Sequence, residues 1–175
     1  YYSNIWARIR WTSKKNNLSK YLSFSSDIKK IKDANIIFIA VGTPSTRRGN
    51  GEADLKYVFS VSEDVSKLLS KDQQRIIITK STVPVGTGRK IKEKIEKLRP
   101  DLNYNKDYFV VSNPEFLREG SAIEDFMRPD RVVCGVTSEI SKEILKELYR
   151  PLNLREAPII FTDLESAELI KYASN

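Results

Sequence analysis

The 175-residue chain contains no histidine and a single cysteine, Cys134. Without histidine, any acid–base chemistry must use Glu, Asp, Lys or bound water. The same shortage disfavours a zinc site, so no metal is expected. One cysteine cannot form an internal disulfide, which fits a reducing compartment. No apolar run approaches the ~20 residues that a membrane span needs, and no secretory signal is visible.

Acidic residues are outnumbered by basic ones, and the net charge is +7 with a pI near 9.4. This charge raises a basic nucleic-acid-binding domain as an alternative from another class of protein. An acid-free start that holds Tyr1, Tyr2, Trp6 and Trp11 supports that alternative. Elsewhere Lys and Glu are mixed on predicted helices, as in residues 89–97, and this favours solvated helix faces over a nucleic-acid surface.

The chain does contain a regular alternation of strand and helix patterns. Unbroken apolar runs predict strands that are covered on both faces, and apolar residues at helical spacing lie between them. The alternation predicts an α/β fold with a doubly wound parallel sheet and right-handed crossovers. The predicted strands are residues 35–41, 75–79, 108–111, 131–136 and 158–162, and the predicted helices are residues 54–69, 87–98, a third that follows Ser138 as N-cap, and a fourth from Leu164 to the end.

Two loops follow the first two predicted strands, at the sheet edge where open α/β sheets bind ligands. In the first loop, residues 41–45, a glycine allows close approach to the backbone and two hydroxyls are available, although a plain turn is an equal alternative. The second loop, residues 80–87, leads into a helix amino end, a natural place for an anion or a dinucleotide. Ser81 and Thr82 could hold a water or a substrate hydroxyl there. Taken alone, helix capping by these hydroxyls would be the preferred interpretation.

A third loop, Asn113–Gly120, follows the third strand and carries the strongest chemical signal. Glu115 and Glu119 place two carboxylates just past the strand, with Phe116, Leu117 and Arg118 between them. This mixture can bind a polar ligand and move a proton. The alternative is an N-capped helical turn with surface acids. It does not explain two large apolar residues expected to be exposed at the sheet edge, so a functional role is favoured.

The last helix carries Lys171 and Asn175, which are four residues apart and therefore share a face. An amine beside an amide could polarise a developing oxyanion. Two solvated polar residues would be the preferred interpretation of this pair in isolation. Cys134 lies inside an apolar strand, where a small core residue is favoured over a nucleophile.

Together these motifs resemble the UDP-glucose/GDP-mannose dehydrogenase family. The resemblance implies a Rossmann-like NAD domain that lacks its first strands. It implies oxidation of UDP-glucose to UDP-glucuronate with two NAD, with GDP-mannose or UDP-N-acetylmannosamine as alternative substrates. It also implies a cytoplasmic protein that supplies polysaccharide precursors, a homo-oligomer when full length, without nucleic-acid or membrane partners. The matching stretches are residues 38–44, 53–58, 80–87, 113–120, 129–132 and 168–175, in family order from about residue 20 to the end.

The resemblance also implies roles for individual residues. Thr82 would hold the substrate hydroxyl or a catalytic water, and Glu115 would be the general base for thioester hydrolysis. Lys171 and Asn175 would bind substrate and stabilise the oxyanion beside C6. The residues that would contact NAD are Val41, Gly42, Thr43, Pro44, Ser45, Ser81, Thr82, Val83 and Glu119. Those that would cradle the sugar nucleotide are Glu115, Phe116, Leu117, Arg118 and Glu119.

Several family features are missing from the printed sequence. There is no Gly-x-Gly-x-x-Gly turn for the pyrophosphate, no acid for the ribose, no nucleophilic cysteine in a glycine-rich motif, and no sugar-binding domain. Residues 1 to about 15 are expected not to resemble the family. The expected division is a poorly defined segment 1–20, a partial NAD domain 21–163 and the start of a connecting helix 164–175. Such a piece is expected to be inert, to bind NAD weakly, and to have an open apolar edge beside strand 35–41.

Overall fold

The computed structural model describes residues 21–44, 53–118, 120–153 and 158–174. The chain divides into two compact units between Lys32 and Asp33. The described part of the first unit contains a short 3-10 helix, η2 (Ile28–Ile31), whose first turn is capped by the Asp27 carboxylate. The second unit holds the sheet and the remaining helices. The predicted poorly defined segment 1–20 lies outside the described residues.

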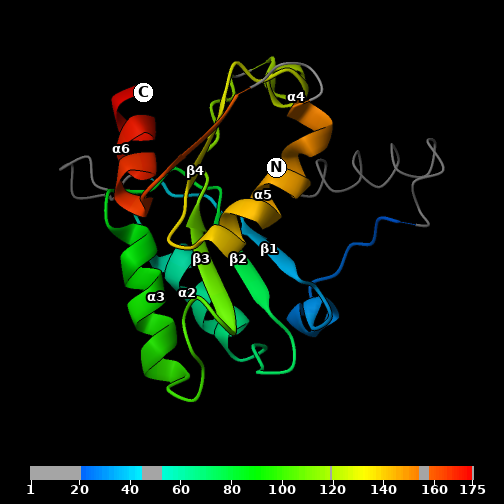
Figure 1. Ribbon diagram of the computed structural model, residues 1–175, viewed down its shortest axis with the longest axis vertical. Coiled ribbons are helices and arrows are strands. Elements are labelled where there is room, and N and C mark those ends of the chain that lie inside the picture. Colours follow the sequence, from blue (N-terminus) through cyan, green and yellow to red (C-terminus); the bar gives the residue numbers. More distant parts are fainter. Residues whose placement is uncertain (1–20, 45–52, 119, 154–157, 175) are drawn as a thin grey trace. The chain divides into compact units, whose positions relative to one another are not determined.

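The second unit is built on a five-stranded sheet in the order β1-β2-β3-β4-β5 (Figure 1). Strands β1, β2 and β3 are parallel, with Ile37 beside Ile77 and Ile77 beside Val110. Every residue of β2 and β3 is buried, as unbroken apolar runs require. All five predicted strands are confirmed, at β1 (Ile36–Ile39), β2 (Arg75–Thr79), β3 (Tyr108–Ser112), β4 (Val132–Gly135) and β5 (Ile159–Thr162).

The four predicted helices are confirmed as well. Ser138 caps its helix as expected, because its hydroxyl accepts a hydrogen bond from Ser141 N at 3.2 Å. A fifth helix, α4, is too short to show an apolar period and buries no residue, so the sequence does not predict it. The helices are α2 (Lys56–Ser66), α3 (Thr87–Leu98), α4 (Ala122–Met127), α5 (Glu139–Asn153) and α6 (Leu164–Ser174).

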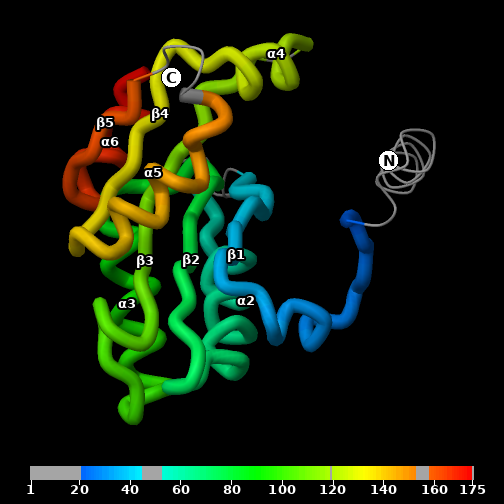
Figure 2. The backbone as a smooth tube through the Cα atoms, turned by 45° about the vertical axis from the view of Figure 1, so that its right-hand side comes forward, coloured from blue at the N-terminus to red at the C-terminus, as the bar shows by residue number. Residues whose placement is uncertain are grey.

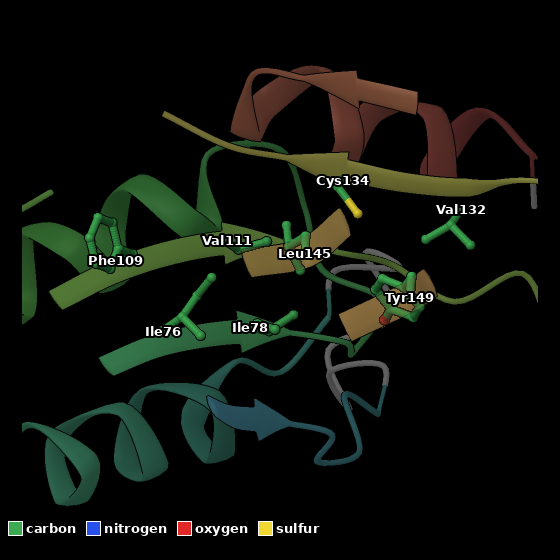
Figure 3. Close-up of a cluster of buried hydrophobic side chains, with 8 residues drawn as sticks. All are labelled: Ile76, Ile78, Phe109, Val111, Val132, Cys134, Leu145 and Tyr149. Carbon is green, nitrogen blue, oxygen red and sulfur yellow. The ribbon is translucent and has the colours of Figure 1, made fainter. Parts of the chain in front are cut away.

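Helices cover both faces of the sheet, which confirms the doubly wound arrangement. On one face, Leu145 and Tyr149 of α5 pack on strand residues such as Ile78 and Phe109 (Figure 3). The strand residues that alternate with these, such as Ile77, point to the other face, where α2, α3 and α6 pack. The buried side chains of that second layer include Val58, Val65, Ile91 and Ile95.

One strand pairing contradicts the all-parallel prediction. Strand β4 runs antiparallel to β3, with Ser112 opposite Gly135, and only β5 then runs parallel to β4. The chain leaves β3 at its carboxyl end, passes through α4, and enters β4 from the same end of the sheet (Figure 2). A parallel pair would need a crossover that returns the chain to the other end of the sheet, and α4, with six residues and a length of about 9 Å, does not span a strand.

The position of β1 leads to a prediction about self-association. Among the described residues β1 pairs only with β2, so it is an edge strand, and Phe38 on it is 43% exposed. We expect the 175-residue chain to self-associate with rising concentration, because an uncovered apolar edge is a template for strand pairing. Phe38→Lys should reduce this association in sedimentation velocity, since a charge on an edge strand opposes pairing.

A matched control is available on α3. Leu98→Lys removes an apolar side chain of similar exposure, 49%, at a distance in sequence and structure from the strand edge. It should leave the association constant unchanged. A wild-type chain that stays monomeric at high concentration would contradict the prediction.

Candidate active site

The carboxyl ends of β1, β2 and β3 lie at one edge of the sheet, and the loops that follow them are bonded to each other. The Ser81 hydroxyl donates to the Val41 carbonyl oxygen at 2.6 Å. The Thr43 hydroxyl donates to the Thr82 carbonyl oxygen at 2.8 Å. The first two loops therefore lie side by side, as the parallel sheet predicts. Helix capping by Ser81 is a wrong interpretation, because the N-cap residue of α3 is Gly86.

Asn113, the first residue after β3, connects the third loop to this edge. It is fully buried, and its Nδ2 donates to the Val133 carbonyl oxygen at 2.7 Å. Its Oδ1 accepts hydrogen bonds from Lys80 Nζ at 3.2 Å and from the Tyr149 hydroxyl. Burial lowers the pKa of the Lys80 amine. The sequence does not reveal this role of Asn113, because its partners come from three other elements.

A cavity of about 480 Å³ opens between the third loop and the segment around α4. Pro114 to Arg118 form one wall, and residues of α4 with Pro129 to Val132 form the other. Lys80 and Tyr149 lie at its base. Residues of two stretches that carry the family resemblance, 114–118 and 129–132, therefore line the same cavity.

Glu115 and Lys171 meet at this edge although they are far apart in sequence. Lys171 Nζ lies 3.7 Å from Glu115 Oε1, and Leu117 N donates to Glu115 Oε2 at 2.6 Å. The side chain of Lys171 is 8% exposed and that of Glu115 is 29% exposed. The interpretation of Lys171 as a solvated residue is therefore wrong, because α6 packs it against the third loop.

Phe116 and Leu117 are half-buried rather than exposed, which corrects the expectation from the sequence. The Phe116 ring lies between two cations, with Lys171 Nζ 5.4 Å and the Arg131 guanidinium 5.2 Å from its centroid. Both contacts are cation–π interactions. The cations come from α6 and from the residue before β4, and their approach could not be read from the local pattern.

Arg118 is turned toward α4. Its guanidinium forms an ion pair with Asp125 at 2.7 Å, and its backbone N–H donates to the same carboxylate at 2.8 Å. The Arg118 guanidinium holds the pKa of Asp125 below its usual range. Arg118 thus ties the third loop to α4, and its contact with a substrate stays a prediction.

The first two loops have the chemistry that a dinucleotide needs. A side chain at Gly42 would meet no atom within 4 Å, so the backbone there is open to a ligand. Thr43, Ser81 and Thr82 are half-buried and supply hydroxyls at this edge. The Val83 side chain is buried in the core. This donor set fits NAD.

The amino end of α3 is not open to a ligand, which corrects the expectation of an anion site there. The carboxylate of Glu168, from α6, accepts hydrogen bonds from Gly86 N at 2.6 Å and from Gly88 N at 2.7 Å. The Ser112 hydroxyl donates to the same carboxylate at 3.0 Å. Glu168 thus occupies the position that an anionic ligand would take. Its role was missed because its partners are distant in sequence.

The buried carboxylate leads to a prediction about pH. Burial raises the pKa of Glu168 above its ordinary value of 4.5, against the opposite influence of its three donors. The stability that this group contributes is therefore complete below its unfolded pKa and is lost as pH rises through its folded pKa. We expect the destabilisation caused by Glu168→Gln to be largest at acidic pH and smaller at neutral pH in urea titrations. A difference that grows with pH would contradict this.

Cys134 is a core residue, as predicted. It lies in β4 and is fully buried against the cluster of Figure 3. Burial raises the pKa of its thiol to about 12. No other cysteine occurs in the sequence, so the described site contains no thiol that could act as a nucleophile at neutral pH.

Three predicted site residues, Ser45, Glu119 and Asn175, lie outside the described residues. Within the described ranges, no cluster of three or more acidic or cysteine side chains could hold a metal ion. None of the helices in those ranges has the length and apolar character to cross a membrane.

A mostly parallel sheet covered on both faces, with three loops gathered at its carboxyl edge, defines a dinucleotide-binding α/β domain of the Rossmann type. Residues 8–153 match the UDP-glucose/GDP-mannose dehydrogenase family, NAD binding domain. The chain belongs to the UDP-glucose/GDP-mannose dehydrogenase family. The match begins at residue 8, so the expectation that residues up to about 15 would not resemble the family is wrong for residues 8–15.

Curated relatives support the same assignment. UDP-glucose 6-dehydrogenase of Rhizobium meliloti is 47% identical over 91% of this chain, and UDP-glucose 6-dehydrogenase TuaD of Bacillus subtilis is 47% identical over 92%. The chain spans 36% and 33% of these relatives, about a third of their length.

Solved structures agree with these relatives. A GDP-mannose dehydrogenase from Pseudomonas aeruginosa superposes with a TM-score of 0.83, 35% identity and coverage of 93% of this chain and 36% of that chain. A UDP-glucose dehydrogenase from Pyrobaculum islandicum superposes with a TM-score of 0.79 and 34% identity, and the match covers 92% of this chain and 36% of that chain.

Proposed function

We propose that this chain carries the NAD-binding part of a nucleotide-sugar 6-dehydrogenase, and that UDP-glucose is the substrate of the whole protein. The observation that carries the proposal is the ion pair of Glu115 and Lys171 at 3.7 Å. It lies at the sheet edge where the first two loops, which we assign to NAD, leave their strands. We assign residues 21–163 to the NAD domain and the helix from 164 onward to the start of a connection to the rest of the protein.

The proposed roles rest on the resemblance to the family, and the positions of the described side chains support them. The first two loops would hold NAD, which would supply a hydride acceptor for each of the two oxidations at the sugar C6 carbon. Lys171 places a positive charge where the C6 oxygen gains negative charge, and its burial strengthens that interaction. Glu115 accepts a proton from the water that attacks the oxidised carbon, which requires no histidine. Thr82 orients the substrate hydroxyl or that water. The resemblance to the family assigns Glu119 to NAD and Asn175 to the oxyanion.

We further propose that the 175 residues alone do not complete this reaction. Two oxidations that end in a carboxylate by thioester hydrolysis need a reactive thiol, and Cys134 is buried with a raised pKa. The Gly-x-Gly-x-x-Gly turn for the pyrophosphate does not occur in the sequence. We expect weak or absent NAD binding in calorimetry, and no NADH from UDP-glucose. NAD-dependent oxidation by this chain would contradict the proposal.

A chimeric enzyme tests the proposal that this segment works as the NAD-binding part of a nucleotide-sugar 6-dehydrogenase. Residues 21–175 replace the corresponding segment of the Bacillus subtilis enzyme TuaD, which is 47% identical to this chain. The rest of the chimera is expected to supply the features that the family resemblance implies and this chain lacks, namely the pyrophosphate turn, the thiol and the sugar-binding domain. We expect NAD-dependent oxidation of UDP-glucose. A folded chimera that produces no NADH would contradict the proposed role of this segment.

UDP-glucose is preferred over GDP-mannose and UDP-N-acetylmannosamine because the relatives at 47% identity are UDP-glucose 6-dehydrogenases. A GDP-mannose dehydrogenase is 35% identical and gives the high TM-score of 0.83, which keeps GDP-mannose as the second candidate. Assays of the whole gene product with the three nucleotide sugars separate these candidates. We propose that the whole protein works as a homo-oligomer in the cytoplasm.

Nucleic acid is not proposed as a partner. Helical lysines are paired with acids, as in Lys92–Glu96 at 2.9 Å and Lys67–Asp64 at 2.7 Å. Such mixed faces are typical of solvated helices. Salt-dependent binding of single-stranded RNA would contradict this interpretation.

A further inference from the structure

Glu168 connects three elements of the fold through one buried carboxylate. It is 2% exposed, belongs to α6, and accepts hydrogen bonds from two backbone amides of α3 and from a hydroxyl of β3. Gly86 N bonds one carboxylate oxygen, while Gly88 N and the Ser112 hydroxyl bond the other. The proposed mechanism does not use this group.

The surroundings of this carboxylate leave little room for movement. A Cβ atom at Gly88 would lie 2.9 Å from Ser112 Oγ and 3.1 Å from Glu168 Oε1, so glycine is required for the carboxylate to reach the backbone. Gly86 adopts a φ of +88°, a conformation that side chains disfavour. These two glycines form a slot that a carboxylate fills with both oxygens. The two backbone N–H groups bond different oxygens of the carboxylate, so an amide in the same position would turn its NH2 group, which is a donor, toward one of them.

A second close contact holds the same end of α6. A Cβ atom at Gly135 of β4 would lie 2.7 Å from the Asp163 carbonyl oxygen and 2.9 Å from Ala167 Cβ. The helix therefore lies directly on the backbone of β4. Glu168 fixes its rotation about its own axis, and the contact at Gly135 fixes its distance from the sheet.

Lys171 follows Glu168 by three residues and so lies on the same face of α6, one turn further along. Its Nζ reaches Glu115 Oε1 at 3.7 Å, across the boundary between α6 and the third loop. A rotation of α6 would carry Lys171 away from Glu115. A displacement of about 1 Å in a reacting group can lower a rate by about a hundredfold.

We infer that Glu168 is a positioning residue: its bonds to the amino end of α3 and to Ser112 set the rotation of α6 and thereby aim Lys171 at Glu115. The geometric statement stands without ligands, and its catalytic meaning rests on the proposed function. Glu165, three residues earlier on α6, gives a matched comparison, because it also pairs with α3 through Arg89 but at the surface.

The test measures the contact between Lys171 and Glu115 directly in the 175-residue chain. Lysines are reductively methylated with a ¹³C label, and the Lys171 signal is the one lost in Lys171→Arg. Glu115→Gln should shift this signal in the wild-type chain. In the Glu168→Gln background the same replacement should produce less than half of that shift. In the Glu165→Gln background the full shift should remain.

Two further variants keep the result interpretable. Glu168→Asp, which retains the charge, should restore part of the shift, and Ser112→Ala should lose part of it, because one donor is removed while the two amides remain. If Glu168→Gln does not fold, as judged by circular dichroism, these two variants decide the question. A full shift in folded Glu168→Gln would overturn the inference. If that variant does not fold, a full shift in Ser112→Ala would overturn it.

The chimeric enzyme separates this inference from the proposed function. Glu168→Gln should lower kcat at least tenfold there and leave the KM for NAD within twofold, because Glu168 bonds the second loop at Gly86, away from Ser81 and Thr82, which bond the first loop. An inactive wild-type chimera together with a lost Lys171 shift would refute the proposed function and keep the positioning role. An active chimera whose kcat does not respond to Glu168→Gln would refute the positioning role alone.

Discussion

Replacement of Lys171 by methionine in the chimeric enzyme should lower kcat by about 10²–10³-fold, the usual effect of removing one donor from an oxyanion site. Lys171 is buried and faces Glu115 at 3.7 Å, and methionine keeps much of its volume while removing its charge. The KM for NAD should change little, because the ion pair and the cation–π contact of Lys171 are with Glu115 and Phe116 of the third loop. Steady-state kinetics with NADH detection measure both constants.

A surface lysine provides the control for this replacement. Lys146→Met removes a charge of the same kind from α5, where Lys146 pairs with Glu143 at 2.6 Å in an exposed ion pair. Such pairs contribute little, so kcat should stay within about twofold of the wild type. Equal losses in the two variants, or a Lys171→Met enzyme with nearly full activity, would contradict the assigned role of Lys171.

Phe109→Ala is expected to destabilise the fold by about 3–5 kcal/mol, because it leaves a cavity in the centre of the sheet. Phe109 is fully buried in β3 and packs in the cluster with Ile76 and Leu145 (Figure 3). Domains of this kind have a total stability of about 5–15 kcal/mol, so the loss would be a large share of it. The free energy of unfolding from urea titration measures the effect.

Phe126→Ala is the matched control for Phe109→Ala. Phe126 lies on α4 and is 43% exposed, so its removal leaves no enclosed cavity. It should cost less than about 1 kcal/mol. Similar losses for the two phenylalanines would mean that the cluster around β3 does not form the core of the domain.

Much of the architecture follows from local sequence patterns. The runs that became β2 and β3 are apolar at every position, and the structure buries every one of their residues. Their carboxyl ends must meet at one edge of a parallel sheet, so the loops after them could be grouped before any coordinates were known. The confirmed cap at Ser138 and the buried Cys134 are likewise consequences of short-range patterns.

Other features depend on contacts between distant parts of the chain. The antiparallel entry of β4 depends on where the connection from β3 returns, which no apolar period records. The bonds of Glu168 with α3 span 80 and 82 residues, and those of Asn113 with Lys80 and Tyr149 span 33 and 36. A side chain's sequence neighbours do not determine which distant donors will surround it.

The family membership, the strands and helices, and the edge that holds the site could therefore be inferred from the order of residues, because periodicity and loop chemistry are local properties. The burial of Lys171, its approach to Glu115 and the capture of the α3 amino end by Glu168 were decided only when α6 packed onto the sheet. Packing brings together charged and polar groups that belong to different elements, so their placement depends on the whole fold.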